Sequence, residues 1–429
     1  MNQILISMSK SGALFKIGLI MTYAHSGIFA HNSDMPVPPA LPTAPEEFRI
    51  SLSQARLTAL LKQPQISQAK RQITSSKNNL SAASSFLNPT VSFSGVNNTV
   101  ASLNPANLNN YSLGFVIETS GRLHIRTLQA KAQLQGAVAD SETVRQNVLQ
   151  AVTSSYIDLQ VANRSLKTEE AAFTSIQQLT NLTEKQFMIG FAPETNFIRA
   201  KIALSQAEQS LLKAVSDVKI ARSNLSLQMG FGPERPVDVT EALDYSPLTL
   251  TLPELQSRAM LSRPEIQSSL AMQNSLKAAI KLQSSQYLPD LNVQTSARFD
   301  SLQMGVSVPL FDFGSIRGSV RKAKEDFKAQ EFQTEQVRQS IRFEVETAWL
   351  QLDLAQHRIA SFQKGILPEA ESLFKKIEKG FGLGQSTILD FLDAQQTFLS
   401  SQNDYNGALG DYQKSINQLE RAIGETIKR

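Results

Sequence analysis

Two segments of the chain carry apolar residues at alternating steps of three and four, which is the pattern of one helix face. In 193–229 nine apolar side chains follow this spacing without a miss, and a mostly apolar stripe of the same kind runs through 386–427. Each segment follows a longer stretch with apolar heptads, at 122–187 and at 316–380. A sustained seven-residue repeat is typical of helices that supercoil around one another. At 1.5 Å per residue each longer helix extends on the order of 90–100 Å, so we expect rods that pack against rods of similar length.

Short segments ahead of the long helices alternate apolar and polar residues with period two. They predict two pairs of strands, 89–96 with 110–118 and 289–297 with 302–310. Such alternation is typical of a sheet with one apolar and one polar face. Four strands are too few to close a barrel, because the smallest known barrels have about eight. Three chains that contribute four strands each are enough.

The same order of elements occurs twice, and short sequences recur with it. A further helix precedes each strand pair, at roughly 51–86 and 253–286. The recurring sequences are Gln63–Ile66 with Arg263–Ile266, Glu184–Gly190 with Glu378–Gly384, and Gly230 with Gly424. The spacing between copies is nearly constant. We therefore predict a first structural repeat at 51–230, a linker at 231–252 and a second repeat at 253–429.

Each pair of long helices is predicted to turn back on itself at a hairpin tip. The tips fall at about 187–196 and 381–390, where Gly190 and Gly384 suit a backbone turn with positive φ. Pro368 lies inside the second long helix and has no proline counterpart in the first. We expect a kink or local break there.

The N-terminal segment is typical of export. Lys10 and Lys16 precede the short apolar run 17–23, which predicts a cleaved signal peptide over 1–30 rather than a membrane anchor. The proline-rich sequence that follows predicts an extended strap over 31–50.

Composition excludes several classes of function. Net charge is +4 with Lys and Arg scattered along the chain, so no nucleic-acid-binding surface is indicated. There is no cysteine, which excludes disulfides, thiolate metal sites and an acylated-cysteine lipid anchor. The four histidines are not clustered, and phosphate-binding loops and catalytic triads are absent from the sequence. We therefore predict no enzyme activity, no cofactor and no metal site.

Two segments resemble one protein family. Gly384–Ala394 and Val308–Gly314, together with the duplicated elements, are similar to the TolC-type outer-membrane efflux proteins. Ile117–Arg122 is similar to the heavy-metal branch of that family. The resemblance implies a mixed α/β fold of mostly long α-helices, in a tandem-repeat protomer. Three protomers would form a twelve-stranded outer-membrane β-barrel continued by a periplasmic α-helical barrel.

The resemblance also implies function, location and partners. It predicts a homotrimeric, passive exit duct in outer-membrane lipid that extends into the periplasm. There it would meet a periplasmic adaptor protein and an inner-membrane pump that drives small molecules or metal ions outward. The residues expected to contact the adaptor at the tips are Gly190, Phe191, Gly384, Gln385 and Ser386.

Four residues near the tips are candidates for a periplasmic gate. Asp390 and Asp393 lie three residues apart on one helix face, and three copies would place six carboxylates around one opening. Asn196 and Arg199 stand at the equivalent points of the first repeat. Our hypothesis is that Arg199 pairs with one of the two aspartates, within or between protomers. The alternative is two solvated acids near a helix N-terminus, which the helix dipole favours.

Two other functions remain open at the level of sequence. A type I protein-secretion duct would share the same architecture. A periplasmic coiled-coil structural protein without a pore would share the long helices, but it would not need amphipathic strands in both repeats.

Overall fold

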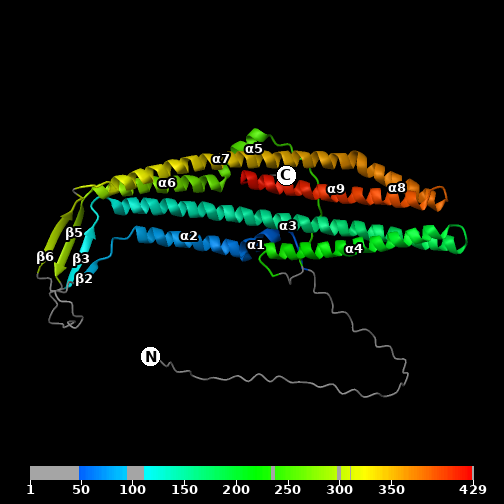
Figure 1. Ribbon diagram of the computed structural model, residues 1–429, viewed down its shortest axis with the longest axis horizontal. Helices are drawn as coiled ribbons and strands as arrows, with labels where there is room; N and C mark the ends of the chain where they lie inside the picture. The colour runs from blue at the N-terminus through cyan, green and yellow to red at the C-terminus, as the bar shows by residue number, and fades with distance from the viewer. Residues whose placement is uncertain (1–47, 94–110, 233–236, 297–300, 310, 428–429) are drawn as a thin grey trace, which may run out of the picture. The chain divides into compact units, whose positions relative to one another are not determined.

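The two halves of the chain fold in the same element order, a strand pair followed by a helical hairpin (Figure 1). The computed structural model describes residues 48–93, 111–232, 237–296, 301–309 and 311–427, which belong to one unit, Glu46–Arg429. The predicted signal peptide and most of the predicted strap lie outside the described residues. The first half contains α1 (Leu52–Lys62), α2 (Pro64–Ala83), β2 (Thr90–Phe93), β3 (Tyr111–Ile117), α3 (Arg122–Met188) and α4 (Glu194–Gln228).

The second half follows the same order with one additional break. Its elements are α5 (Leu252–Ser262), α6 (Pro264–Ser284), a 3-10 turn (Ser285–Tyr287), β5 (Asp290–Ser296), β6 (Leu302–Ser307), α7 (Ser315–Ser361), a π-helical turn (Phe362–Ile366), α8 (Leu367–Gly382) and α9 (Ile388–Ile423). Among the described residues, no helix combines the length and apolar character that crossing a bilayer requires.

The prediction of single helices over 51–86 and 253–286 is wrong. Each is divided into two helices, because Pro64 and Pro264 lack the N–H that a continuous helix needs. The residue before each proline, Gln63 or Arg263, is extended, with ψ of 124° and 121°. This is the conformation that a following proline imposes.

The break at Pro368 takes the form of a π-helical turn. Pro368 lies in the first turn of α8, directly after the π turn that ends at Ile366. The wider turn shifts the helical register, so Ile366, which continues the apolar heptad stripe predicted over 316–380, is 44% exposed. The stripe residues before the break, such as Ile341, Val345 and Leu352, are buried as predicted.

The four strands form one antiparallel sheet in the order β2–β3–β5–β6. The strand pairs of the two halves are joined through β3 and β5, where Phe115 stands opposite Val293 and Ile117 opposite Leu291. The sequence predicted the two strand pairs but not that β3 and β5 would join them into one sheet.

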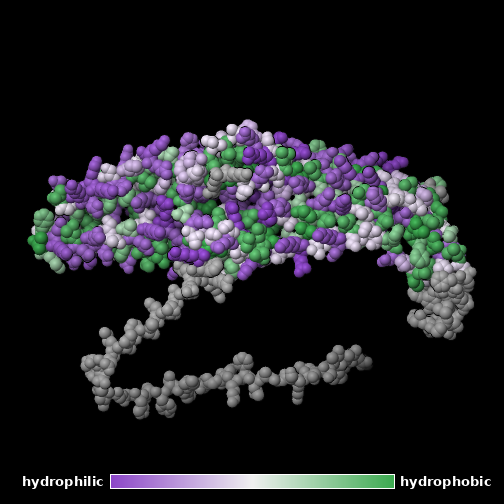
Figure 2. Space-filling model, turned by 180° about the vertical axis from the view of Figure 1, so that it is seen from behind, coloured by the Kyte–Doolittle hydropathy of each residue, from purple (hydrophilic) through white to green (hydrophobic). Residues whose placement is uncertain are grey.

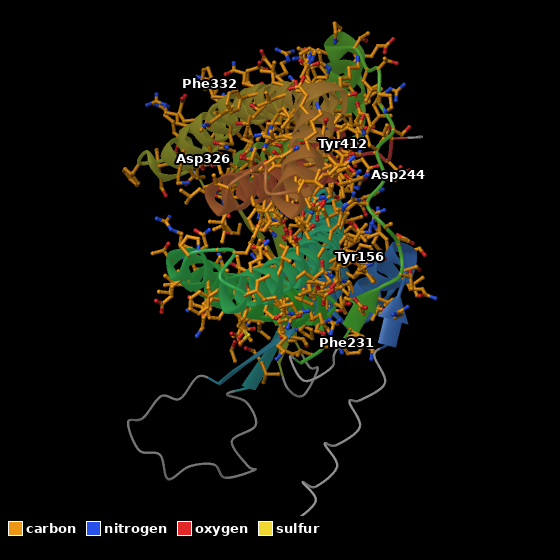
Figure 3. The ribbon with its side chains drawn as sticks, turned by 90° about the vertical axis from the view of Figure 1, so that its right-hand side faces the viewer. Tyr156, Phe231, Asp244, Asp326, Phe332 and Tyr412 are labelled. Atoms are coloured by element: carbon orange, nitrogen blue, oxygen red, sulfur yellow. The ribbon has the colours of Figure 1, made fainter. Side chains whose placement is uncertain are left out.

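A second, two-stranded sheet was not predicted. β1 (Phe48–Ile50) pairs in parallel with β4 (Val237–Val239), although these segments were interpreted as strap and linker. A buried tyrosine attaches this sheet to the helices, because the Tyr156 hydroxyl donates to the carbonyl of Ile50 over 3.2 Å. In the other half, the Tyr412 hydroxyl donates to the carbonyl of Ser246 (Figure 3). Short segments with few apolar residues gave no periodic signal for these contacts.

The C-terminal ends of α4 and α9, the second helices of the two hairpins, pack against a break between two shorter helices. For α4 this is the break between α1 and α2, and for α9 it is the break between α5 and α6. At the first joint, Gly230 (φ 81°) lies against the backbone of Lys62 and Gln63, and the Gln63 side chain donates to the carbonyl of Gln228. The second joint has the same arrangement, with Gly424 (φ 77°) against Ser262.

At the second joint the buried Arg263 takes the position that Gln63 has at the first joint. Arg263 is 3% exposed and donates to the carbonyls of Arg421 and Ala422 over 3.0 and 3.1 Å. Its guanidinium also pairs with Glu265 at 2.9 Å and with Glu344 at 2.8 Å. One side chain therefore holds the end of α9, the start of α6 and the middle of α7 together.

Candidate functional site

The two hairpin tips are short turns of similar backbone geometry. The first tip (residues 189–193) connects α3 to α4, and the second tip (residues 383–387) connects α8 to α9. Gly190 and Gly384 both have φ of 73°, as the turn prediction required. The turns are closed by backbone hydrogen bonds of 2.8 Å, from Phe191 to Gln186 and from Gln385 to Gly380.

The second tip has a capping box that the first tip lacks. The Thr387 hydroxyl accepts from the backbone N–H of Asp390, and the Asp390 carboxylate accepts from the Thr387 hydroxyl and N–H over 2.7 and 2.9 Å. The hydroxyl hydrogen bond is the main reason that the pKa of Asp390 is lowered, and the N–H bond adds to it. Pro193 stands at the corresponding N-cap of α4 and gives no side-chain hydrogen bond.

The tips expose apolar side chains. Met188, Ile189, Phe191 and Leu383 are each between 64% and 78% exposed. Figure 2 shows hydrophobic residues at this end of the helices, at the left of the view. The ring of Phe191 lies 4.0 Å from the position that a Cβ on Gly384 would occupy, so the two tips are neighbours. We call these four residues the tip patch. Of its members only Phe191 was singled out from the sequence.

A hydrophobic cluster behind the tips joins the two hairpins. Ile176 and Leu179 of α3 and Ala200 of α4 share it with Phe381 of α8 and Phe391 of α9. The Phe381 and Phe391 rings lie 5.6 Å apart. The position of the tip patch is therefore fixed by packing between the two halves.

The gate candidates lie just inside the tips but are not paired with one another. Asp393 and Arg199 are exposed, and Asn196 is half-buried. Within the part of the protomer that the structure describes, no ion pair joins Arg199 to Asp390 or Asp393. The carboxylate of Asp390 is instead engaged by Thr387. The form of the hypothesis in which Arg199 pairs across protomers stays a prediction.

At the opposite end of the helices, the register of the sheet sorts its residues onto two faces. One face is apolar apart from Thr295 and carries Val91, Leu113, Phe115, Ile117, Leu291, Val293, Leu302, Met304 and Val306. The other face carries small and polar residues apart from Val116, and there the Gln294 amide donates to the Ser112 hydroxyl over 2.7 Å. Alternation within each strand was visible in the sequence, whereas its continuity across four strands depends on register.

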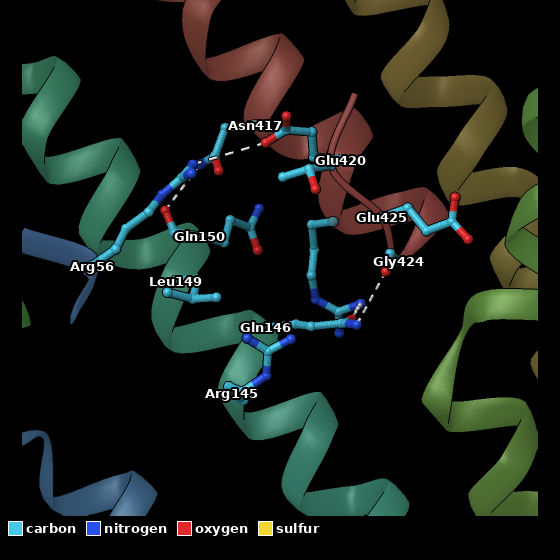
Figure 4. Close-up of a pocket in the computed structure, with 11 residues that line it drawn as sticks. Arg56, Arg145, Gln146, Leu149, Gln150, Asn417, Glu420, Gly424 and Glu425 are labelled. Atoms are coloured by element: carbon cyan, nitrogen blue, oxygen red, sulfur yellow. Dashed lines mark hydrogen bonds and ion pairs between the residues drawn. The ribbon is translucent and has the colours of Figure 1, made fainter. Parts of the chain in front are cut away.

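A cavity of about 240 Å³ lies between α1, α3 and α9 (Figure 4). Its polar groups are engaged in structural contacts. Arg56 pairs with Glu420 at 3.8 Å, the Asn417 amide donates to the Gln150 carbonyl, and Arg421 pairs with Glu265. The first two contacts connect the two halves, and the third joins α9 to α6 within the second half. In the described ranges no group of three or more His, Asp or Glu side chains is placed to hold a metal ion.

Comparisons with known proteins agree with this architecture. The family model of outer membrane efflux proteins matches residues 56–230 and 255–425. The cobalt-zinc-cadmium resistance protein CzcC of Cupriavidus metallidurans is 24% identical over 72% of this chain and 75% of its own length.

Solved structures show the same fold at low sequence identity. The outer membrane protein VceC of Vibrio cholerae superposes with a TM-score of 0.72 at 18% identity, over 88% of this chain and 97% of that one. The CmeC outer membrane channel of Campylobacter jejuni gives 0.75 at 17% identity, over 87% and 85%. The matching family model spans most of both halves, and its members are channels. The chain therefore belongs to the outer membrane efflux protein family and works as the outer-membrane channel of an efflux system, not as an enzyme.

Proposed function

We propose that three copies of this chain form the exit duct of a tripartite efflux system. The observation that carries the proposal is that a single protomer leaves apolar surface exposed at both ends, on one face of the sheet and at the tip patch. Four strands cannot close on themselves, whereas the sheets of three copies close into one cylinder with its apolar face toward lipid. The repeats 51–230 and 253–429 each supply a strand pair and a helical hairpin, and 231–252 connects them.

The tip patch is the proposed docking surface for a periplasmic adaptor protein, which links the duct to an inner-membrane pump. Exposed Met and Phe side chains are suited to this role, because aromatic residues and Met are enriched in the buried centres of protein interfaces. The turn residues Gly190, Gly384, Gln385 and Ser386 would frame this contact. The first three are exposed and Ser386 is half-buried.

The proposed cargo is divalent metal cations. Sequence similarity to a protein named for cobalt, zinc and cadmium resistance supports this choice. The exposed carboxylate of Asp393 just inside the second tip also supports it, since three copies would line an opening with negative charge. Small organic molecules and secreted proteins are the competing cargoes, and the experiment below separates them.

Deleting the gene is expected to sensitise cells to Zn²⁺, Co²⁺ and Cd²⁺ but not to hydrophobic antibiotics, and the intact gene should restore growth. The double variant Phe191→Ser/Leu383→Ser should reach the outer membrane as a trimer yet fail to restore growth. Removing two anchors from a docking surface weakens binding by roughly tenfold or more. The measurements are minimal inhibitory concentrations and binding of the purified trimer to purified adaptor.

The matched control is Leu61→Ser/Leu261→Ser, which removes equally exposed leucines from α1 and α5, away from the tips. It should restore growth fully. Full metal resistance with the tip double variant would refute the docking surface. Sensitisation to antibiotics alone, or loss of a secreted protein alone, would refute the metal cargo.

The gate hypothesis predicts a change in single-channel conductance. Single channels of Arg199→Ala and of Asp393→Ala should conduct more than the wild-type protein in planar bilayers, because each change removes one partner of an ion pair between protomers. Asp393 is the cleaner site, since replacing Asp390 would also remove the capping box. The control is Asp404→Asn, an exposed acid further along α9. If both alanine variants conduct like the wild type, these residues do not hold the tip closed.

A further inference from the structure

A ring of exposed aromatic residues marks the boundary between the sheet and the helices. Phe86 lies between α2 and β2, Tyr287 between α6 and β5, and Phe311 and Phe313 between β6 and α7. The three phenylalanines are 77% to 98% exposed. Three of the four described connections at this end therefore contribute an aromatic ring, next to the apolar face of the sheet; the fourth, 118–121 between β3 and α3, has none. We call these four residues the collar.

Basic residues follow the collar on the helical side. In the first three turns of α7, Arg317, Arg321 and Lys324 are exposed, and no acidic residue precedes Glu325 in that helix. Their spacing of four and three places them on one face. That face differs from the one that packs in the protein, which carries the buried Ala323 and the half-buried Phe327. We call the three residues the basic stripe.

Two arginines in the first turns of α3 are engaged within the protein. Arg122 pairs with Asp290 at 2.6 Å, and Arg126 pairs with Glu118 at 2.8 Å. By contrast, no ion pair reaches Arg321 or Lys324 from the described part of the protomer. Arg122 and Arg126 are therefore paired within the protein, whereas Arg321 and Lys324 are exposed and available to an outside anion.

Helix α2, which packs against α3, adds positive charge at the same end of the helices. It carries Lys70, Arg71 and Lys77, all exposed, and no acidic residue. Net charge over the whole chain is only +4, so positive charge is concentrated on helices beside the sheet. Lys324 lies seven residues after Arg317, or about 10 Å along the helix, which is close to one Debye length at physiological ionic strength.

We propose that the collar and the basic stripe form a binding surface for anionic phospholipid head groups, where the sheet leaves the bilayer. Aromatic rings are favoured at the boundary between hydrocarbon and water. Basic side chains just beyond that boundary attract an anionic leaflet, and a guanidinium can hold a phosphate through two hydrogen bonds. The inference rests on the proposed insertion of the sheet in the membrane, and it adds the chemical class of lipid that lines the protein there.

The test measures lipid selectivity of the full-length trimer in phosphatidylcholine bilayers. Trace spin-labelled phosphatidylglycerol or phosphatidylcholine reports, by electron paramagnetic resonance, the fraction of lipid held at the protein. The wild-type protein should prefer phosphatidylglycerol by about fivefold at low salt, with the preference falling in 0.5 M NaCl. The variant Arg317→Gln/Arg321→Gln/Lys324→Gln should lose most of it.

The matched control is Lys201→Gln/Lys213→Gln/Lys219→Gln, which removes three exposed charges from α4 on the tip side. It should keep the preference. Equal loss in both variants, or no preference in the wild-type protein, would overturn the proposal. A changed anion-to-cation permeability in the stripe variant with unchanged lipid selectivity would also overturn it, because the stripe would then face the channel. Failure of the wild-type trimer to insert into vesicles at all would instead refute the membrane-inserted duct.

Discussion

Gly230→Ala is expected to remove most of the folded protein from the outer membrane. The alanine Cβ would lie 2.8 Å from the carbonyl carbon and oxygen of Lys62 and 2.9 Å from the nitrogen of Gln63. These are backbone atoms at the break between α1 and α2, so they cannot move aside as a side chain can. The φ of 81° adds a cost of about 1–2 kcal/mol for any residue with a Cβ. Together with overpacking, which costs about 1–3 kcal/mol, we expect a loss of about 2–5 kcal/mol.

Variants of two other glycines distinguish the cost of steric overlap from the cost of the backbone conformation. Gly424→Ala places its Cβ 3.2 Å from the Ser262 carbonyl oxygen, so its effect should be intermediate. Gly190→Ala has a φ of 73° but no atom within 4 Å, so only the conformational cost of about 1 kcal/mol should remain. The measurements are the yield of trimer in the outer membrane and the midpoint of thermal unfolding in detergent. Equal effects at all three positions would show that the contact at the first joint is unimportant.

Arg263→Met is expected to destabilise the protein by about 2–4 kcal/mol, because it removes one partner from a buried network. The change leaves Glu265 and Glu344 without their shared cation and removes the side-chain donor to the carbonyls of Arg421 and Ala422. Gln63→Met is the matched control at the equivalent position, where a single neutral hydrogen bond to the Gln228 carbonyl is lost. Its cost should be about 1 kcal/mol. If the two variants unfold at the same temperature, the guanidinium of Arg263 contributes no more stability than the amide of Gln63.

The same network predicts how acid affects stability. Burial tends to raise the pKa of Glu265, but the hydrogen bond from Arg421 and the charge of Arg263 outweigh it, so the pKa is lowered from 4.5. A lowered pKa gives stability that is present above 4.5 and is lost as pH falls through the folded-state value. We therefore expect the wild-type protein to lose stability in that range. Arg263→Met should lose less, because one of the groups that lower the pKa is absent.

Strong periodicity made the larger part of the fold predictable. The return helices predicted at 193–229 and 386–427 are observed as α4 and α9, and the apolar stripe on each is buried or half-buried. The wrong predictions fall where one residue overrides a pattern. Pro64 and Pro264 each divide a helix, and the π-helical turn before Pro368 moves Ile366 off the buried stripe.

The candidate site was only partly predictable. The turns at Gly190 and Gly384 could be located because helix ends have a local signal. The sequence did not show that the carboxylate of Asp390 would accept a hydrogen bond from Thr387. The same residues are compatible with a solvated acid or with a ring of carboxylates around an opening. Met188, Ile189 and Leu383 fall within the predicted tips, but the sequence did not show that their side chains would lie exposed outside the core.

By itself, the sequence determined the element types, their order and their duplication, because periodicity and turn residues act over a few neighbouring positions. Tertiary structure decided which elements meet: β3 beside β5, β1 beside β4, the joint at Arg263 and the packing of Phe191 over Gly384. The physical reason is the separation along the chain over which each kind of interaction acts. Local backbone preferences are set by adjacent residues, whereas register, burial and charge pairing depend on atoms brought together from distant parts of the chain, such as Arg56 and Glu420.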